Sequence, residues 1–285
     1  GMADTVMVTT AGEAAVSGIS LVDSINLLLI QVFAALGTGG AVVVSQYLGR
    51  RDLDRACSAA KQLLYFITAV SLTLMALALL FRQSILAFLF GNIEPDVMEN
   101  ALVYFLLTAL AYPFISVYNA GAALFRSMGN SKVSMQVSLL MNGINVVGNA
   151  ICIFVLKMGV AGVAVPTVVS RCVAAVVILL LAAKPKQELC LKWGAICHAD
   201  GKMIGSILRI GVPNACENSF FQLGRLIVVS MIALFGTVQT SANAVANTLD
   251  SVGIIIGQAM GLAMVTVVGQ CVGAGDPAQV RHYVK

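Results

Sequence analysis

Residues 24–49 read SINLLLIQVFAALGTGGAVVVSQYLG, a run of 26 residues without a single Asp, Glu, Lys or Arg. An α-helix needs about 20 mostly apolar residues to cross a bilayer, so this run predicts a membrane-spanning helix. The rest of the chain is similar, because 59% of its 285 residues are hydrophobic and only 11% are charged. Soluble domains carry roughly a quarter of charged residues. The composition therefore excludes an ordinary soluble domain, a disordered chain and a coiled coil.

Comparable apolar stretches recur along the chain, separated by turns that are rich in Gly, Pro and Asn. They predict an all-α membrane protein, a polytopic bundle of about eight membrane-spanning helices of which the first is incomplete. Pro113 and Pro166 lie inside two of these helices and favour bends there. The expected spans are residues 1–10, 15–48, 62–82, 98–124, 132–156, 159–183, 204–235 and 239–272.

The positive charges predict the orientation of the bundle. Of the 17 Lys and Arg residues, 13 lie in the stretches that follow the second, fourth, sixth and eighth spans. Because Lys and Arg concentrate in cytoplasmic loops, we expect these even-numbered loops to be cytoplasmic. We also expect the protein in the cytoplasmic membrane of the cell.

The chain contains an internal repeat with a period of 224 residues. This shift aligns residues 43–49 (VVSQYLG) with residues 267–273 (VVGQCVG), and 12 of the 61 aligned pairs are identical. Six spans fit in one period, and an even number predicts parallel repeats related by an axis along the membrane normal. We expect residues 1–200 to form an N-terminal lobe with its basic linker. Residues 201–285 would begin a C-terminal lobe, with about four helices of that lobe still missing.

Charged side chains inside the membrane are costly and usually functional. Asp4 is the only charged residue among residues 1–12, so its carboxyl must face a cavity or a partner. It could exchange a proton or bind a cation, or make a structural hydrogen bond between helices. Glu217 is a further candidate for ion or substrate binding, because it lies four residues after Pro213, where a disturbed helix frees backbone carbonyls. Arg171 and Arg225 are the two basic residues expected inside the membrane, where they would act as counter-ions or reach toward the membrane surface.

Several amides and acids line up on single helix faces. Asn142, Asn145 and Asn149 follow an i, i+3, i+7 spacing, which places them on one face of the fifth span. Asp23 and Asn26 share a face of the second span, and the repeat aligns them with an amide and an acid of the eighth. A structural role as hydrogen-bonding contacts between helices remains open for all of them. The secondary candidates for ion or substrate binding are Asp23, Asn26, Asn142, Asn247 and Asp250.

Several motifs in this order resemble the multidrug and toxic compound extrusion (MATE) family. They are residues 1–8 (GMADTVMV), 46–49 (QYLG), 125–132 (FRSMGNSK), 145–149 (NVVGN), 159–167 (GVAGVAVPT) and 211–213 (GVP). The resemblance implies two six-helix lobes that form a V, with the substrate in the cleft between them. It also implies export of bulky organic cations in exchange for H⁺ or Na⁺. The family's amino-terminal ion site corresponds here to Asp4, Asn145, Asn149 and Thr167. Some members have Asp in place of Asn149, so the amide weakens the case for tight Na⁺ binding and mildly favours protons.

The sequence lacks a P-loop, a dinucleotide-binding glycine motif after a strand and a zinc-protease motif. We therefore expect a transporter driven by an ion gradient, not an enzyme, with no cofactor besides the coupling ion. The expected partners are small organic cations and the lipid bilayer, with no nucleic acid and a monomeric state. Two alternatives remain: a flippase for lipid-linked sugars or cell-wall precursors, and a membrane protein or fragment that does not transport.

Overall fold

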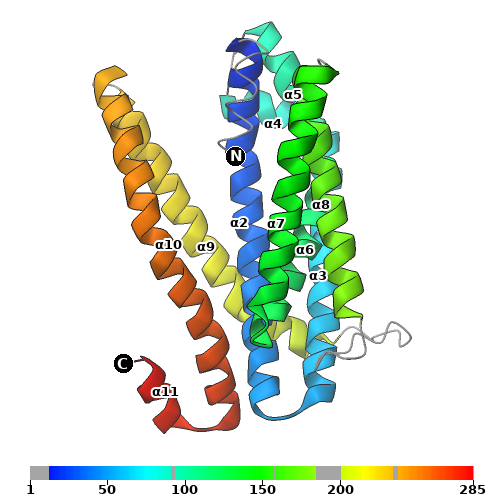
Figure 1. The fold of residues 1–285 in the computed structure, drawn as a ribbon, viewed down its shortest axis with the longest axis vertical. Coiled ribbons are helices and arrows are strands. Elements are labelled where there is room, and N and C mark those ends of the chain that lie inside the picture. Colours follow the sequence, from blue (N-terminus) through cyan, green and yellow to red (C-terminus); the bar gives the residue numbers. More distant parts are fainter. Residues whose placement is uncertain (1–12, 91–93, 157, 184–199, 234–236, 285) are drawn as a thin grey trace.

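The computed structural model describes residues 13–90, 94–156, 158–183, 200–233 and 237–284. Within these ranges every regular element is a helix, which confirms the expected all-α class. Figure 1 shows long helices running side by side. The helices are α2 (Glu13–Gly49), α3 (Leu53–Leu80), α4 (Arg82–Phe90), α5 (Pro95–Leu110), α6 (Tyr112–Ser127), α7 (Ser131–Ala150), the π-helix η2 (Ile151–Val155), α8 (Ala161–Ala182), α9 (Gly201–Ala233), α10 (Thr237–Ala274) and α11 (Pro277–Val284).

Five helical stretches are long and apolar enough to cross a membrane, and the pair α5 and α6 forms a sixth span if it is counted as one. These stretches lie in α2, α3, α7 with η2, α8 and α10. Helix α9 coincides with the expected span 204–235 but is not among them, in keeping with the charges it carries. The expected span 1–10 lies outside the described residues. The seven other expected spans each correspond to a helix or a helix pair.

Two differences from the expected spans have local causes. Helix α3 begins at Leu53, nine residues before the expected start, because the Asp52 side chain caps it by accepting a hydrogen bond from the Arg55 N–H at 3.1 Å. The span expected at 98–124 is two helices that meet at Ala111 with a bend of 46°. Pro113 lacks a backbone N–H and so breaks the helical hydrogen-bond ladder there, as the sequence indicated.

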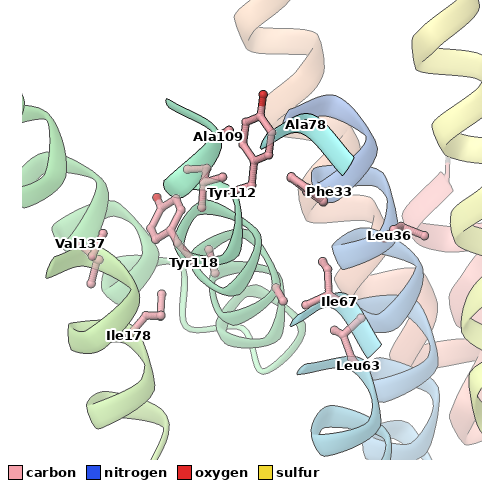
Figure 2. Packing of buried hydrophobic residues seen from close by; sticks show 14 of the residues in the cluster. Phe33, Leu36, Leu63, Ile67, Ala78, Ala109, Tyr112, Tyr118, Val137 and Ile178 are labelled. Carbon is pink, nitrogen blue, oxygen red and sulfur yellow. The ribbon is translucent and has the colours of Figure 1, made fainter. Parts of the chain in front are cut away.

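Helix α2 is the central element of the described fold, since it packs against α3, α5, α6, α9 and α10. Figure 2 shows the core around it, where Phe33 of α2 and Tyr112 of α6 lie next to each other. Their rings are 6.3 Å apart and tilted by 59°. Leu63 and Ile67 of α3 are completely buried in the same hydrophobic cluster.

Helices α9 and α10 meet the other helices at one end and spread away from them toward the other end (Figure 1). Glycines allow the close approach of α2 to α9. A Cβ added at Gly39 would lie 2.7 Å from the backbone N of Gly211, which is too near for any side chain. The expected lobe boundary at residue 200 separates α8 from α9, and the division into lobes stays a prediction.

Candidate functional site

Three of the predicted ion-site residues form one hydrogen-bonded group between α7 and α8. The Asn145 side-chain amide donates to the Thr167 hydroxyl at 3.0 Å, and the Asn149 amide donates to the Asn145 side-chain oxygen at 3.4 Å. Asn149 and Thr167 are buried, and Asn145 is half-buried. We call these three residues the amide cluster. The fourth predicted member, Asp4, lies outside the described residues.

The local backbone brings the members of the amide cluster together. A Cβ on Gly148 would lie 2.7 Å from the Pro166 side chain, so the absence of a side chain lets α7 approach α8 at this level. The Thr167 hydroxyl donates to the Val163 carbonyl at 2.8 Å, which fixes its direction toward Asn145. The π-helix η2 starts at Ile151, two residues after Asn149. Short π-helical turns of this kind often occur at functional sites.

A second polar group lies between α2, α5 and α6. The Tyr104 hydroxyl donates to a carboxylate oxygen of Asp23 at 3.0 Å, and the Tyr112 hydroxyl donates to the Asn26 side-chain oxygen at 2.9 Å. Asn26, Tyr104 and Tyr112 are buried, whereas Asp23 is half-buried. The Asn26 side-chain nitrogen is buried without a hydrogen-bond partner in the described structure. We call these four residues the tyrosine cluster.

The two tyrosines are functional candidates that the sequence reasoning missed, although it did place Asp23 and Asn26 on one helix face. A buried tyrosine hydroxyl normally needs a hydrogen-bond partner. Tyr104 and Tyr112 in an apolar stretch could therefore have been matched with polar residues of another span. Their partners are 81 and 86 residues away in sequence, however, and only the packing of α2 against α5 and α6 identifies them.

Arg171 brings a positive charge near the tyrosine cluster. It lies on α8 four residues after Thr167, and positions four apart share one face of a helix. Its guanidinium also interacts electrostatically with Tyr112 of the tyrosine cluster. Arg171 is half-buried. A positive charge therefore accompanies the polar groups in the interior of the helix bundle.

The structure does not bring the remaining candidates into these groups. The side chain of Asn142 is exposed and donates to the Ser138 carbonyl of its own helix at 2.9 Å. Glu217 on α9 and Asp250 on α10 are exposed, and Asn247 is half-buried. These three positions lie on the helices that diverge from the rest of the bundle (Figure 1).

The two groups place amide, hydroxyl and carboxylate oxygens in the low-dielectric interior of the helix bundle. Amide and hydroxyl oxygens can ligate a hard cation, and they can also form hydrogen bonds to water or to a protonated carboxyl. A buried donor without a partner, such as the Asn26 nitrogen, is costly unless a ligand or a water molecule satisfies it.

The family model MatE matches residues 1–151 and 213–285 of this chain. The chain belongs to the MatE family. Both segments that the internal repeat relates, residues 1–61 and 225–285, fall in the matched ranges. The resemblance seen in the sequence motifs is thereby confirmed.

Curated relatives carry transporter names. The "Uncharacterized transporter YisQ" of Bacillus subtilis is 26% identical over 96% of this chain and 60% of its own length. The "Probable multidrug resistance protein NorM" of Thermotoga maritima is 26% identical over 100% of this chain and 61% of its own length. The "Multidrug export protein MepA" of Staphylococcus haemolyticus is 24% identical over 78% of this chain and 48% of its own length. The chain thus spans about 60% of the length of the first two relatives.

Solved structures share the fold. A MATE crystal structure in the straight conformation superposes with a TM-score of 0.91 at 21% identity, over 99% of this chain and 63% of that one. A MOP superfamily transporter from Pyrococcus furiosus, described as having a binding pocket of reverse polarity, superposes with a TM-score of 0.88 at 22% identity, over 99% of this chain and 62% of that one. Together with the apolar helices, family membership makes this chain a multi-pass membrane protein.

Proposed function

We propose that this chain belongs to an antiporter that exports small organic cations in exchange for an ion. The observation that carries the proposal is the amide cluster, which joins three residues of the expected ion site by hydrogen bonds between α7 and α8. The names of the curated relatives, which include multidrug resistance and multidrug export proteins, agree with such a role.

In this proposal Asp4 supplies the exchangeable negative charge and the amide cluster supplies neutral oxygens beside it. A cluster of two amides and a hydroxyl contains no carboxylate of its own. Asn149 stands where some family members have Asp, and the loss of that carboxylate weakens the case for a tight Na⁺ site, so the coupling ion is proposed to be the proton. The protonated acid would no longer attract a cationic substrate. Ion and substrate then compete through a shared conformational equilibrium, and their coupling must be reciprocal.

The test is dye efflux from proteoliposomes that contain the protein expressed from its complete open reading frame. A cationic dye is loaded, and a proton gradient or a Na⁺ gradient is imposed separately. We expect efflux with the proton gradient, and we expect Asp4→Asn to abolish it. The matched control is Asp96→Asn, the same change at an exposed position near the start of α5. Efflux by Asp4→Asn at the unsubstituted rate would refute the assigned role.

A flippase for anionic lipid-linked precursors is the second candidate, and Arg171 favours it because a pyrophosphate group needs basic ligands in the membrane interior. Arg225, the other basic residue expected inside the membrane, is exposed on α9. A single half-buried arginine is a weaker match to a doubly charged headgroup than the amide cluster is to an ion. Flipping of a fluorescent pyrophosphate lipid, without dye efflux, would establish this alternative instead.

A further inference from the structure

The repeat in the sequence is also a contact in the structure. Gly49 at the end of α2 packs against the backbone of Gln270 in α10, and Gly273 of α10 packs against the backbone of Gln46 in α2. The 224-residue shift aligns Gly49 with Gly273 and Gln46 with Gln270. Each copy therefore presents the same two residues to the other. This reciprocity is the mark of a two-fold contact.

No side chain larger than hydrogen fits at the centre of this contact. A Cβ at Gly49 or Gly273 would overlap the backbone of the facing helix, and a Cβ at Gly269 would overlap the Ser45 side chain. Close backbone approach through small residues is a common way for helices to associate in membranes. The contact lies at the end of the molecule where α9 and α10 join the other helices (Figure 1).

Two side chains of α10 also reach the end of α6. The Thr266 hydroxyl donates to the Arg126 carbonyl at 3.0 Å, and the Gln270 side-chain nitrogen donates to the Ser127 carbonyl at 2.9 Å. The last carbonyls of a helix lack the full set of partners within their own helix. These hydrogen bonds therefore join groups that are 140 and 143 residues apart in sequence. The Arg126 carbonyl also accepts a hydrogen bond from the Gly129 N–H at 2.8 Å, so Thr266 adds a second donor to it.

We propose that Thr266 and Gln270 form a latch that holds this end of the molecule closed, and that the latch opens when α9 and α10 separate from α2 and α6 during transport. The inference rests on the proposed function. Because the loops after α2, α6 and α10 carry the predicted cytoplasmic charges, the latch closes the predicted cytoplasmic end.

The repeat extends the proposal to α2. Gln46 is the equivalent of Gln270, so in a complete second repeat its side chain would donate to the counterpart of the Ser127 carbonyl. A shift of Ser127 by 224 residues places that counterpart after residue 285. A complete second repeat would therefore add a second latch, formed by Gln46 and related to the first by the repeat.

The first experiment locks the contact covalently. In the complete protein, Ala41→Cys combined with Val265→Cys places one thiol on α2 and one on α10, both on the lining of the small cavity between α2, α6 and α10 that Thr266 also lines. A short bifunctional thiol reagent that joins the two cysteines should stop dye efflux, and reductive cleavage of the reagent should restore it. Each single cysteine variant, treated with the same reagent, is the control and should keep its efflux, because neither substitution removes a latch residue. Efflux by the cross-linked protein at the reduced rate would overturn the proposal.

The second experiment removes the latch and needs no transport. Spin labels attached through unnatural amino acids at the exposed positions Lys132 and Ala278 report the separation of α7 from α11 in nanodiscs. The double variant Thr266→Val, Gln270→Leu should raise the ratio of molecules with a long label-to-label distance to molecules with a short one roughly tenfold. Single hydrogen bonds between membrane helices contribute little, but the contributions of two of them add. The matched control replaces the exposed residues Thr73 and Gln136 by Val and Leu, and should leave the distances unchanged.

The two experiments separate the latch from the transport function. If the unsubstituted protein exports no dye under any gradient, the proposed function fails, and the distance measurement still decides the latch. If dye is exported but the label-to-label distances of the Thr266→Val, Gln270→Leu protein equal those of the control, the latch proposal is refuted while the proposed function stands. If the double variant does not fold, the single Gln270→Leu variant takes its place and should show a smaller increase in the population at the long label-to-label distance.

Discussion

Helices α2 and α10 are the two copies of one helix, yet they lie in different surroundings. Phe33 of α2 is completely buried, and its repeat equivalent, Gly257 of α10, lies in open space. Two turns further along, the sizes of the paired residues are exchanged: the small residue is Gly40 of α2, which faces Leu63, and its larger equivalent, Met264 of α10, is half-buried. The repeat therefore preserves the backbone and the reciprocal contact at Gly49, while each copy has adapted its side chains to its own neighbours.

The polar pairs on the two helices show the same divergence. Asn26 of α2 is buried, and Asp23 beside it accepts a hydrogen bond from Tyr104. On α10 the equivalent of Asn26 is Asp250, which is exposed. A shared sequence pattern thus does not produce a shared site, because the tyrosines that complete the α2 pair come from other helices.

The largest expected effect exchanges a residue of α2 for its α10 equivalent. A Cβ at Gly40 would overlap the Leu63 side chain, so Gly40→Met should lower the free energy of unfolding by about 3 kcal/mol. The measurement is unfolding of the complete protein in mixed micelles. Gly143→Met on α7, where no atom lies within 4 Å of an added Cβ, is the control and should cost nothing. Equal stability of the two variants would show that α2 is not enclosed.

The next effect concerns the tyrosine cluster. Tyr112→Phe leaves the buried Asn26 side chain without the hydroxyl that now donates to its oxygen, and should cost about 2 kcal/mol in the same unfolding assay. Tyr65→Phe on the exposed side of α3 is the matched control. Replacing Asn26 by Leu in the Tyr112→Phe protein should restore part of the loss, because both polar groups are then absent. A double variant no more stable than Tyr112→Phe would contradict this account.

A smaller effect is expected in the amide cluster. Thr167→Val preserves the shape of the side chain but removes the hydroxyl that accepts from Asn145, and should cost about 1 kcal/mol. Thr73→Val is the control, because the Thr73 hydroxyl bonds only to the Ala69 carbonyl of its own exposed helix face. Under the proposed function, dye efflux should fall in Thr167→Val and remain in Thr73→Val. Loss of stability without any change in efflux would make the cluster structural.

The smallest expected effect concerns Asp250 and tests whether the surface of α10 around it is exposed. Asp250 is exposed, so Asp250→Asn should change the free energy of unfolding by less than about 0.5 kcal/mol. The assay is again the unfolding of the complete protein. A change of several times this size would show that further helices enclose α10 there, as α5 and α6 enclose α2.

Part of the candidate site could be predicted from sequence and part could not. The spacing of Asn145 and Asn149 placed them on one face of α7, and the family resemblance added Thr167, which the structure bonds to Asn145. The same spacing also included Asn142, whose side chain is exposed and bonds within its own helix. Periodicity defines a face of a helix, but it does not say how far along that face the neighbouring helix remains in contact.

The helical class, the approximate spans, the repeat and most of the polar candidates could be predicted from the order of residues alone. They follow from hydrophobic run length and spacing, which depend only on neighbours along the chain. The pairing of Tyr104 and Tyr112 with Asp23 and Asn26, and the hydrogen bonds from α10 to the end of α6, come instead from the packing of the helices. Those contacts join residues more than 80 positions apart, and the close approach of the helices that creates them depends on which side chains happen to be small at the crossing points.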